Sequence, residues 1–470
     1  MEDYNEILGF VEIDNISHPF HFSSESFDLL VYPPTVERWQ ENRDSLLMEF
    51  SKQHHRTFKW IGKHKIKGIT ARGHSIVFCV SDSFGSNNGF ITYRVEWVVC
   101  HSKQDYSIDQ INGLRITGGD INYFYPAYKA LKPHFTHNAD YSYKTLQVSS
   151  TSQDYLSCGK YRVVPHIDAA IQINSYATIH FENEKNPIDA ESNILVNYSR
   201  PVTIDVVIQT INDLFLFFVY TCYRSNISFP TIEVFWLNQN KKRDFNGRVL
   251  MSRKCTPEVH ERIRERIIPY DFWGTRTSRM LTTIKNGKLD FEHLCDSISE
   301  QKSYPHSRFI LILAEFEREF RNIYGTDYNR SKMYTETKAE VMQLLNELSG
   351  KKTGKSKQYV KSLVKSISNL DNSYSLKVKQ ALNDCIDIMR PFIEREYDSY
   401  SPKVIDGIAI RSGELRNGFV HSRLDLKLEA IHLADIQIIE ELVYAMRLKL
   451  YERDSKKVQS AISRLFGKRI

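Results

Sequence analysis

Two patterns of apolar positions divide the chain. From Phe10 to about Leu237, short runs rich in Val, Ile, Phe, Tyr and Thr alternate with Gly, Asn, Asp, Ser and Pro, which is typical of strands joined by turns. Beyond Pro257, apolar residues recur three and four positions apart over long stretches, which predicts amphipathic helices. We therefore expect an α+β, multidomain fold, in which an all-α helical bundle follows a β-rich, sandwich-like N-terminal region.

The expected regions have approximate boundaries. The β-rich region is expected over 1–245, a partly helical connector over 246–305 and the helical bundle over 306–470. Ser, Thr and Gln accumulate over 138–154, which indicates a division of the first region into two subdomains. The segment 82–89 is predicted to be a hairpin loop, because Gly and Asn tolerate positive φ. The clearest predicted strands are 75–80, 90–100, 169–173, 177–181 and 231–237.

The bundle is expected to contain about four long helices whose apolar stripes form an ordinary core. The stretches with this pattern are 309–320, 335–348, 357–367, 376–396 and 431–446. In the first half, the most apolar stretch is 214–223, which is about half the roughly 20 residues needed to span a bilayer. We interpret it as a buried strand or a short core helix.

Charge distribution and cysteine usage bear on the cellular location of the protein. The net charge of +6 is unevenly divided, since residues 1–250 carry 24 basic and 27 acidic side chains and residues 251–470 carry 39 and 30. The excess positive charge therefore lies in the second half. The 7 cysteines are scattered without a CxxC pair, which favours a reducing cytosol. Met1 to Tyr4 is acidic and polar, unlike the start of a signal peptide. We expect a cytoplasmic protein without a membrane partner.

Metal and nucleotide sites are not expected. His18, His21, His54 and His55 have no Cys or carboxylate near them at a recognised ligand spacing. The glycine-containing segment 113–119 has neither a Walker lysine nor a GxGxxG pattern. We therefore expect no cofactor.

One short motif carries candidate chemistry. The segment 413–421, Gly-Glu-Leu-Arg-Asn-Gly-Phe-Val-His, contains Arg416, Asn417 and His421. An Arg followed by a His after four to six residues occurs three times in the chain, about as often as chance allows, so context must decide. The other two pairs lie along a predicted strand and around a proline in the connector: Arg94 with His101, and Arg253 with His260. Only Arg416 and His421 lie in the helical region, after a polar break, where we expect them to open the last long helix.

This motif resembles the Arg-x4–6-His signature of HEPN ribonucleases. The first bundle helix is similar to the first HEPN helix of ApeA-like anti-phage proteins, because its apolar residues lead into Glu317, with Phe320 and Arg321 three and four positions later. The order of a β-rich region and then a helical one is also similar. The resemblance is most specific over 306–470, whereas before about residue 250 it rests on architecture alone.

The resemblance implies a metal-independent endoribonuclease in which the RNA 2′-hydroxyl attacks the adjacent phosphate. His421 would act as the acid or base near neutral pH. Arg416 would hold phosphate oxygens and stabilise their developing charge. Asn417 would bind the phosphate or orient His421, and Glu317 would orient Arg416 or Arg321. The products would carry a 2′,3′-cyclic phosphate and a 5′-hydroxyl.

The resemblance also implies a biological setting: bacterial defence against phage by abortive infection, with transfer RNA anticodon loops as the expected substrate. The β-rich region would sense infection or restrain the nuclease, in response to a phage-derived trigger or inhibitor. On an ideal helix Arg416 and His421 would be about 140° apart. Either the helix begins or distorts between them, at Gly418, or a second chain completes each site. The second answer implies a homodimer or a higher homo-oligomer.

Alternatives remain open at this point. Arg416 could pair with Glu414 or Asp425 at an ordinary helix start. A non-catalytic HEPN bundle could serve as a binding or assembly module beside a ligand-recognising β domain. Four lysines could track an RNA backbone or lie in a solvated loop between helices: Lys351, Lys352, Lys355 and Lys357. The basic C-terminal residues, from Arg447 to Arg469, could bind RNA or simply suit the end of a helix.

Overall fold

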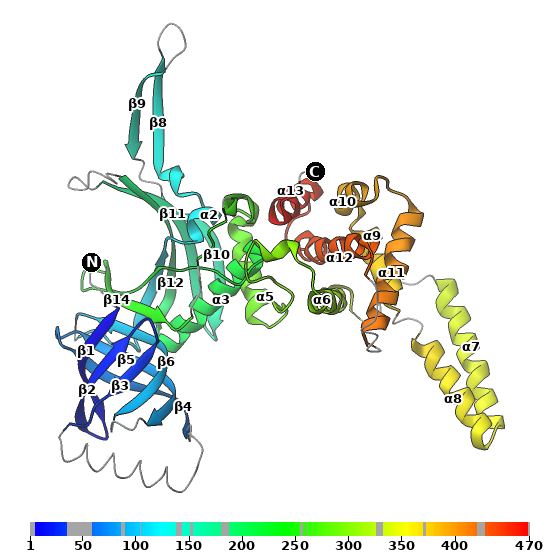
Figure 1. Cartoon of the computed structure of the whole chain (residues 1–470), viewed down its shortest axis with the longest axis horizontal. Helices are drawn as coiled ribbons and strands as arrows, with labels where there is room; N and C mark the ends of the chain where they lie inside the picture. The colour runs from blue at the N-terminus through cyan, green and yellow to red at the C-terminus, as the bar shows by residue number, and fades with distance from the viewer. Residues whose placement is uncertain are drawn as a thin grey trace. The chain divides into compact units, whose positions relative to one another are not determined.

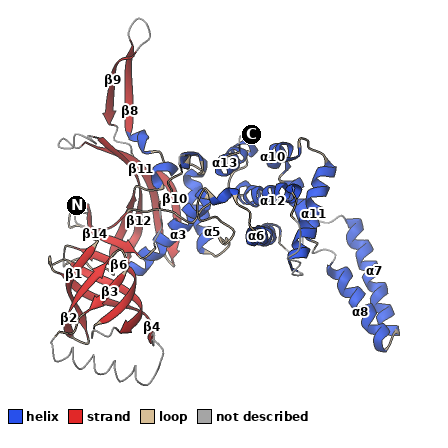
Figure 2. Cartoon of the chain, viewed as in Figure 1, coloured by secondary structure: helices blue, strands red, loops and turns tan. Residues whose placement is uncertain are grey.

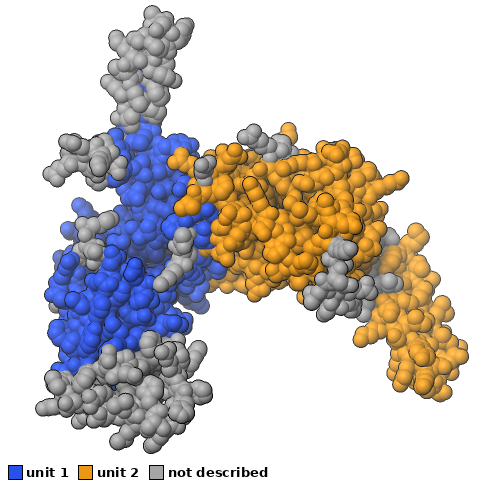
Figure 3. Space-filling view, viewed as in Figure 1, with its two compact units in different colours: residues 1–218, 226–258, 273–282 blue, residues 219–225, 259–272, 283–470 orange. Residues whose placement is uncertain are grey.

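The structure is a computed structural model, and it forms two compact units (Figure 3). Unit 1 comprises Met1–Phe218, Asn226–Glu258 and Trp273–Thr282, and unit 2 comprises Val219–Ser225, Val259–Phe272 and Thr283–Ile470. The residues that the structure describes are 5–34, 59–85, 90–103, 105–137, 143–150, 154–179, 188–253, 257–260, 262–325, 332–369, 373–420 and 428–468. The fold is α+β and multidomain, as the sequence predicts.

The first six strands of unit 1 close into an antiparallel barrel (Figures 1 and 2). They are β1 (Glu6–Ile13), β2 (Ile16–Ser23), β3 (Asp28–Val31), β4 (Lys59–Thr70), β5 (Ser75–Gly85) and β6 (Ile91–His101). The order is β6-β3-β2-β1-β4-β5, and β5 pairs again with β6. The core follows the two-residue period, because Ile7 and Val11 point inward while Leu8 and Phe10 are exposed. The prediction of sandwich-like packing is wrong for these six strands. The barrel closes through the pairing of β5 with β6, so that each strand has a neighbour on both sides.

The remaining long strands extend the same sheet from β6. They are β7 (Ile111–Thr117), β10 (Leu156–Val164), β11 (Ile167–Ile179), β12 (Ile188–Val202), β13 (Thr231–Leu237) and β14 (Arg243–Met251). Their order is β10-β11-β12-β7-β13-β14, and β14 pairs with β6. A separate hairpin joins β8 (Leu131–His137) to β9 (Tyr143–Ser150), next to η1 (Ala127–Ala130).

Strand β6 divides one of its sides between two partners. Its first residues, Ile91 to Arg94, pair with β3, whereas Trp97 to His101 pair with β14. Its other side pairs with β5. Strands β3 and β14 therefore diverge at Val95 and Glu96, whose backbones bond to Phe27 and Ser252 at 3.0 Å and 2.9 Å.

Helix α3 (Ile204–Cys222) supplies the apolar layer beside the sheet of unit 1. Phe217 and Phe218 are fully buried and pack edge-on against Phe124 of the short α2 (Ile121–Phe124). Among the described residues, α3 is the one helix long and apolar enough to cross a membrane, and 67% of that window is buried in the fold. The stretch 214–223 is thus largely a core helix, as one of the two predicted alternatives had it, and the helix begins ten residues earlier.

Long helices make up most of unit 2 (Figure 2). They are α6 (His306–Tyr324), α7 (Lys332–Lys351), α8 (Gly354–Asn369), α9 (Tyr374–Asp384), α10 (Ile386–Tyr397), α11 (Pro402–Val420), α12 (Ala430–Lys449) and α13 (Ser455–Phe466). Shorter helices precede them in the chain: η2 (Ile263–Glu265), α4 (Tyr270–Trp273), η3 (Gly274–Arg276), α5 (Thr277–Lys285) and η4 (Glu300–Lys302). Of these, η3 and most of α5 belong to unit 1. Helix α12 is central, because it packs against α6, α9, α10, α11 and α13.

The expected elements differ from the observed ones at several places. The stretch 376–396 is not one helix, since α9 ends and α10 begins at Cys385, just after Asn383 and Asp384, which favour turns over helix interiors. The division of this stretch, together with the additional helices α11 and α13, brings the number of described helices from α6 to α13 to eight, above the expected four or so. The predicted loop 82–89 is wrong over 82–85, which β5 includes, and residues 86–89 lie outside the described part. The two strands predicted over 169–181 are one, β11.

The expected domain boundaries stay predictions. Strand β14 continues past residue 245, and unit 1 also takes in Trp273–Thr282. Within the proposed subdomain break, 138–142 and 151–153 lie outside the described residues, and the rest contains all of β9.

Candidate active site

Helices α9 and α11 approach closely where the candidate site begins. A Cβ atom on Gly413 would lie 2.2 Å from the Ser375 Oγ, so a side chain there would force the Ser375 hydroxyl to move. Arg416 lies one turn beyond Gly413 on α11, and Lys377 lies two residues beyond Ser375 on α9. The close contact therefore sets the positions of both cations relative to each other.

Glu317 of α6 holds these two cations. Its Oε1 accepts a hydrogen bond from the Lys377 Nζ at 2.9 Å, and its Oε2 accepts one from the Arg416 Nη2 at 3.3 Å. The Lys377 side chain is 9% exposed, whereas that of Arg416 is 36% exposed. The three helices thus converge on one carboxylate, with its lysine inside and its arginine toward solvent.

Glu317 remains ionised in this setting. Burial acts to raise the pKa of its carboxyl group, but the hydrogen bond and charge of Lys377, together with the charge of Arg416, outweigh burial and lower that pKa. Tyr374 of α9 lies close enough to Glu317 to feel its charge. The buried hydroxyl of Tyr374 has no hydrogen-bond partner among the described residues. Burial, and then the charge of Glu317, raise the pKa of Tyr374, so its phenol stays neutral.

Arg416 can bind an anion from this position. A guanidinium carries five N–H donors in a planar fork, and the contact with Glu317 engages one nitrogen. The partial exposure of the side chain leaves the group accessible to a ligand such as a phosphate. Because Glu317 fixes the side chain in advance, binding would cost less conformational entropy than it does for a free surface arginine.

The other predicted site residues are less constrained. Asn417 is exposed on α11, and Arg321 is exposed on α6, one turn after Glu317. The Glu317 carboxylate contacts Arg416 and Lys377, and the alternative pairing of Arg416 with Glu414 is not seen. His421 and Asp425 lie outside the described residues.

The motif lies at the end of a helix, not at the start of one. Helix α11 runs from Pro402 to Val420, and the last long helices, α12 and α13, begin after it. Gly418 is buried within α11, so the idea that a helix begins between Arg416 and His421 is wrong. Phe419 anchors this end of α11, with its ring 6.2 Å from that of His306 and 6.3 Å from that of Phe309.

The lysine-rich segment forms the turn of the α7–α8 helical hairpin. Gly354, with φ +59°, allows the chain to reverse between the two helices. The four candidate lysines are all exposed: Lys351, Lys352, Lys355 and Lys357. The segment is thus solvated, as one of the two interpretations expected, and its binding role stays a prediction.

Several basic residues of the C-terminal segment have structural roles. Arg447 forms a buried ion pair with Glu319. Lys468 contacts Glu396 and Glu441 at 3.0 Å and 2.6 Å, which ties the end of the chain to α10 and α12. These two cations are therefore poor candidates for RNA contacts.

Sequence reasoning missed Lys377. Its signal was a lysine within the apolar stripe of α9, beside Tyr374, Val378 and Ala381, where a buried cation requires a carboxylate partner.

The sequence also gave no sign of a basic pocket of about 540 Å³ in unit 2. None of the described residues that line this pocket is acidic: Val259, His260, Arg262, Arg266 and Lys302. Because Lys302 is distant in sequence from the others, no local pattern could have identified this cluster.

The candidate histidines do not form a described metal site. His21 pairs with Glu6, while His54 and His55 lie outside the described residues. Within the described part of the chain, no group of three or more His, Cys, Asp and Glu side chains could hold a metal ion.

Comparisons with known proteins add no name to this site. No protein-family model, no curated protein and no solved structure matches the chain.

Proposed function

We propose that this protein is a metal-independent endoribonuclease whose helical unit has an HEPN fold of the ApeA-like class. The observation that supports this most directly is the contact between Glu317 and Arg416. It links the two helices that the resemblance names, across 99 residues of sequence.

The proposed mechanism uses the RNA's own 2′-hydroxyl as the nucleophile. His421 takes the proton of this hydroxyl or returns one to the leaving 5′-oxygen. Arg416 binds the scissile phosphate and stabilises the charge that develops on its oxygens. Glu317 holds Arg416 in place, and Lys377 keeps Glu317 ionised. Asn417, exposed beside Arg416, contacts the phosphate or orients His421.

RNA binding would extend beyond the reacting phosphate. Arg321 and the four hairpin lysines, Lys351, Lys352, Lys355 and Lys357, would contact the RNA backbone, to which exposed cations bind by releasing counterions. The favoured substrate class is transfer RNA at its anticodon loop, where unpaired nucleotides leave the 2′-hydroxyl free to align.

The active form is proposed to be a homodimer or a higher homo-oligomer. Each helix of the site carries a large exposed apolar side chain: Ile310 on α6, Leu376 on α9 and Ile410 on α11. Exposed apolar residues of this size suit a symmetric contact with a second chain. In its biological role, the nuclease would act in abortive anti-phage defence, with unit 1 responding to a phage-derived trigger or inhibitor.

The decisive experiment is RNA cleavage by the purified full chain in EDTA. The native protein, Arg416→Ala and His421→Ala are compared on transfer RNA, and the product ends are sequenced. Lys403→Ala is the matched control, because Lys403 is an exposed cation on the same helix, α11. We expect cleavage by the native and control proteins alone, with 2′,3′-cyclic phosphate and 5′-hydroxyl ends. Products with 5′-phosphates, or cleavage that survives both substitutions, would overturn the proposal.

A non-catalytic binding module is the second candidate, because the ion pair between Arg416 and Glu317 also serves to hold α11 against α6. Growth on expression separates the two functions. A catalytic protein harms cells unless His421 is replaced by Ala, whereas a binding module harms them equally with either residue.

A further inference from the structure

The basic pocket of unit 2 brings together cations from two separate segments of the chain. Arg262 and Arg266 lie at the two ends of η2, whereas Lys302 is the last residue of η4. Val259 and His260 complete the described lining, which contains no acidic side chain. Positive charge is therefore concentrated in one hollow of about 540 Å³.

The η2 side of the pocket is held in place by the end of α13. The carbonyl oxygen of Arg264 accepts a hydrogen bond from the Arg464 Nη2 at 2.6 Å. A Cβ atom on Gly467, which caps α13, would lie 2.0 Å from the Arg266 Cζ, so the Arg266 guanidinium packs directly on that backbone. Ile268, two residues beyond Arg266, is fully buried. This side of the pocket is thus formed before any ligand arrives.

The η4 side is held by a buried arginine. The Arg308 Nη1 donates hydrogen bonds, 2.7 to 3.0 Å long, to the backbone carbonyl oxygens of three residues around Lys302: Glu300, Gln301 and Ser303. The backbone that carries Lys302 is therefore fixed, while the exposed side chain of Lys302 can adjust to a ligand.

The charge of Arg266 is poorly compensated in this setting. Burial, and then the charge of Arg262, lower the pKa of Arg266, and the charge of Glu265 opposes them more weakly. Arginine nevertheless stays charged at neutral pH, so the two guanidiniums repel each other. The nearby Glu300 carboxylate accepts a hydrogen bond from the Asp296 backbone N–H at 3.1 Å. An anion between the two guanidiniums would stabilise both.

Phosphate oxygens suit these cations best. A planar guanidinium binds two phosphate oxygens at once, and a lysine ammonium binds phosphate as a point charge. Two linked phosphates offer enough oxygens for two arginines and a lysine together. At about 30 Å³ for each water-sized group, the pocket admits roughly 18 such groups, so a diphosphate leaves room for the rest of a small molecule.

We propose that unit 2 binds a small phosphorylated molecule in the basic pocket, with a diphosphate group held by Arg262, Arg266 and Lys302. Nucleoside diphosphates belong to this class. An RNA backbone fits less well, because its phosphates carry one charge each and are spread along an extended strand. The proposal does not depend on the nuclease, since its residues lie outside the group around Arg416 and binding is measured without RNA.

The test is calorimetric titration of the full chain with inorganic pyrophosphate and with orthophosphate, at one ionic strength. We expect pyrophosphate to bind about tenfold more tightly, because its second phosphate adds charge-assisted hydrogen bonds. Failure of pyrophosphate to bind, or equal binding of the two anions, would overturn the proposal. Oligothymidylate, which has no 2′-hydroxyl to support cleavage, is the third probe. If it bound more tightly than pyrophosphate, the pocket would belong to a nucleic-acid surface and the proposal would be wrong.

Variants assign the binding to the pocket. Arg262→Gln and Lys302→Gln change exposed side chains, so the fold should persist, and each should weaken pyrophosphate binding about tenfold. Lys302→Glu reverses the charge and should abolish binding. The matched control is Arg390→Gln, since Arg390 is an exposed arginine of unit 2 whose guanidinium lies 4.7 Å from the Tyr400 ring centre. Native affinity in both Arg262→Gln and Lys302→Gln would contradict the proposed contacts.

Discussion

Lys377 and Arg416 share one carboxylate, with the lysine on Oε1 of Glu317 and the arginine on Oε2. The buried lysine makes the shorter contact, 2.9 Å against 3.3 Å. The carboxylate is therefore anchored from inside the bundle and presents its second oxygen to the more exposed arginine. This arrangement separates two roles, because the lysine supports the carboxylate and the carboxylate orients the arginine.

Replacement of Glu317 by Gln should reduce activity without abolishing it. Arg416 keeps its charge but loses its ionic partner, so we expect a loss of roughly 10- to 100-fold in kcat, against 10²- to 10³-fold or more for Arg416→Ala. The buried Lys377 would also lose its counter-charge, which should cost about 3 kcal/mol of stability. Single-turnover cleavage well below the melting temperature measures the first effect, and thermal unfolding measures the second.

Lys377→Met is the control for that experiment. A methionine of similar volume removes the buried cation, while Glu317 keeps the charge of Arg416 and is 21% exposed. The loss of stability should therefore be smaller than for Glu317→Gln, and Arg416 should keep its contact with Glu317. A rate as low as that of Glu317→Gln would show that Glu317 cannot orient Arg416 without the lysine.

The close approach of α9 and α11 can be tested by a double-mutant cycle. Gly413→Ala should destabilise the protein by about 1 to 3 kcal/mol, because the new methyl group meets the Ser375 Oγ. Ser375→Ala removes that oxygen, so the double variant should recover most of the loss in both stability and cleavage rate. Additive effects of the two substitutions would exclude this contact as the cause.

His293 should make the protein sensitive to acid. Burial, and then the charge of Arg308, lower the pKa of its imidazole to about 3, and neither ring nitrogen has a hydrogen-bond partner among the described residues. Between about pH 3 and 6.5 the unfolded chain binds a proton that the folded chain excludes. The stability due to the neutral ring is therefore complete above 6.5 and is lost as the pH falls, by about 2 kcal/mol at pH 5.

His293→Leu removes this titration while roughly keeping the volume. The melting temperature of the variant relative to the native chain should rise by about 4 to 8 °C between pH 7.5 and pH 5. The comparison of one variant at two pH values cancels any constant effect of the substitution. A gap that does not change with pH would mean that His293 is not excluded from protonation in the folded state.

The turn of the α7–α8 hairpin should contribute to RNA affinity through charge alone. Lys351→Ala combined with Lys352→Ala should lower the slope of log affinity against log salt by about 1.4, if both lysines contact phosphates of a single strand. The variant Lys241→Ala with Lys242→Ala, at the exposed β13–β14 turn, is the matched control. Binding is measured with Arg416→Ala in the background, so that the RNA stays intact. Identical slopes for the two pairs would remove the hairpin from the RNA-binding surface.

Local patterns predicted individual elements well. Strand β13 matches the predicted 231–237 because its β-branched and aromatic residues pack into the sheet, and α6 follows from the apolar stripe of Phe309, Phe316 and Phe320. The closure of the barrel was not predictable, since it depends on the pairing of β1 with β4 and of β3 with β6, strands far apart in sequence. Helix α11 has a weaker pattern, because glycine interrupts it at Gly407, Gly413 and Gly418.

The candidate site was likewise only partly predictable from local sequence patterns. The motif was enough to select Arg416, and the resemblance of the first helix was enough to select Glu317. Two residues that were selected separately from the sequence are thus in contact. Lys377 completes the group from a third helix, and its place depends on the α9–α11 contact at Gly413. Spacing along a single helix could not convey that three-dimensional arrangement.

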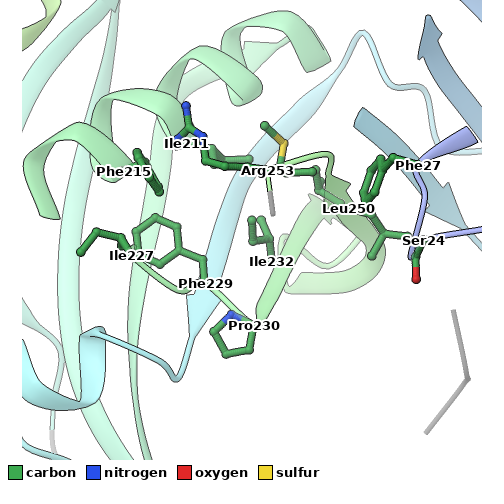
Figure 4. Close-up of a pocket in the computed structure, with 12 residues that line it drawn as sticks. Ser24, Phe27, Ile211, Phe215, Ile227, Phe229, Pro230, Ile232, Leu250 and Arg253 are labelled. Atoms are coloured by element: carbon green, nitrogen blue, oxygen red, sulfur yellow. The ribbon is translucent and has the colours of Figure 1, made fainter. Parts of the chain in front are cut away.

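The divided pairing of β6 has a mechanical consequence. A pocket of unit 1 is lined by Phe27, which directly precedes β3, and by Val249 to Met251 of β14 (Figure 4). A molecule bound there would therefore contact the chain on both sides of the point where β3 and β14 diverge. A bound molecule would resist movement of β3 and β14 relative to each other. It would thereby stiffen the connection between the barrel and the rest of the sheet. Slower amide hydrogen exchange along both β3 and β14, with little change in β11, would show this stiffening.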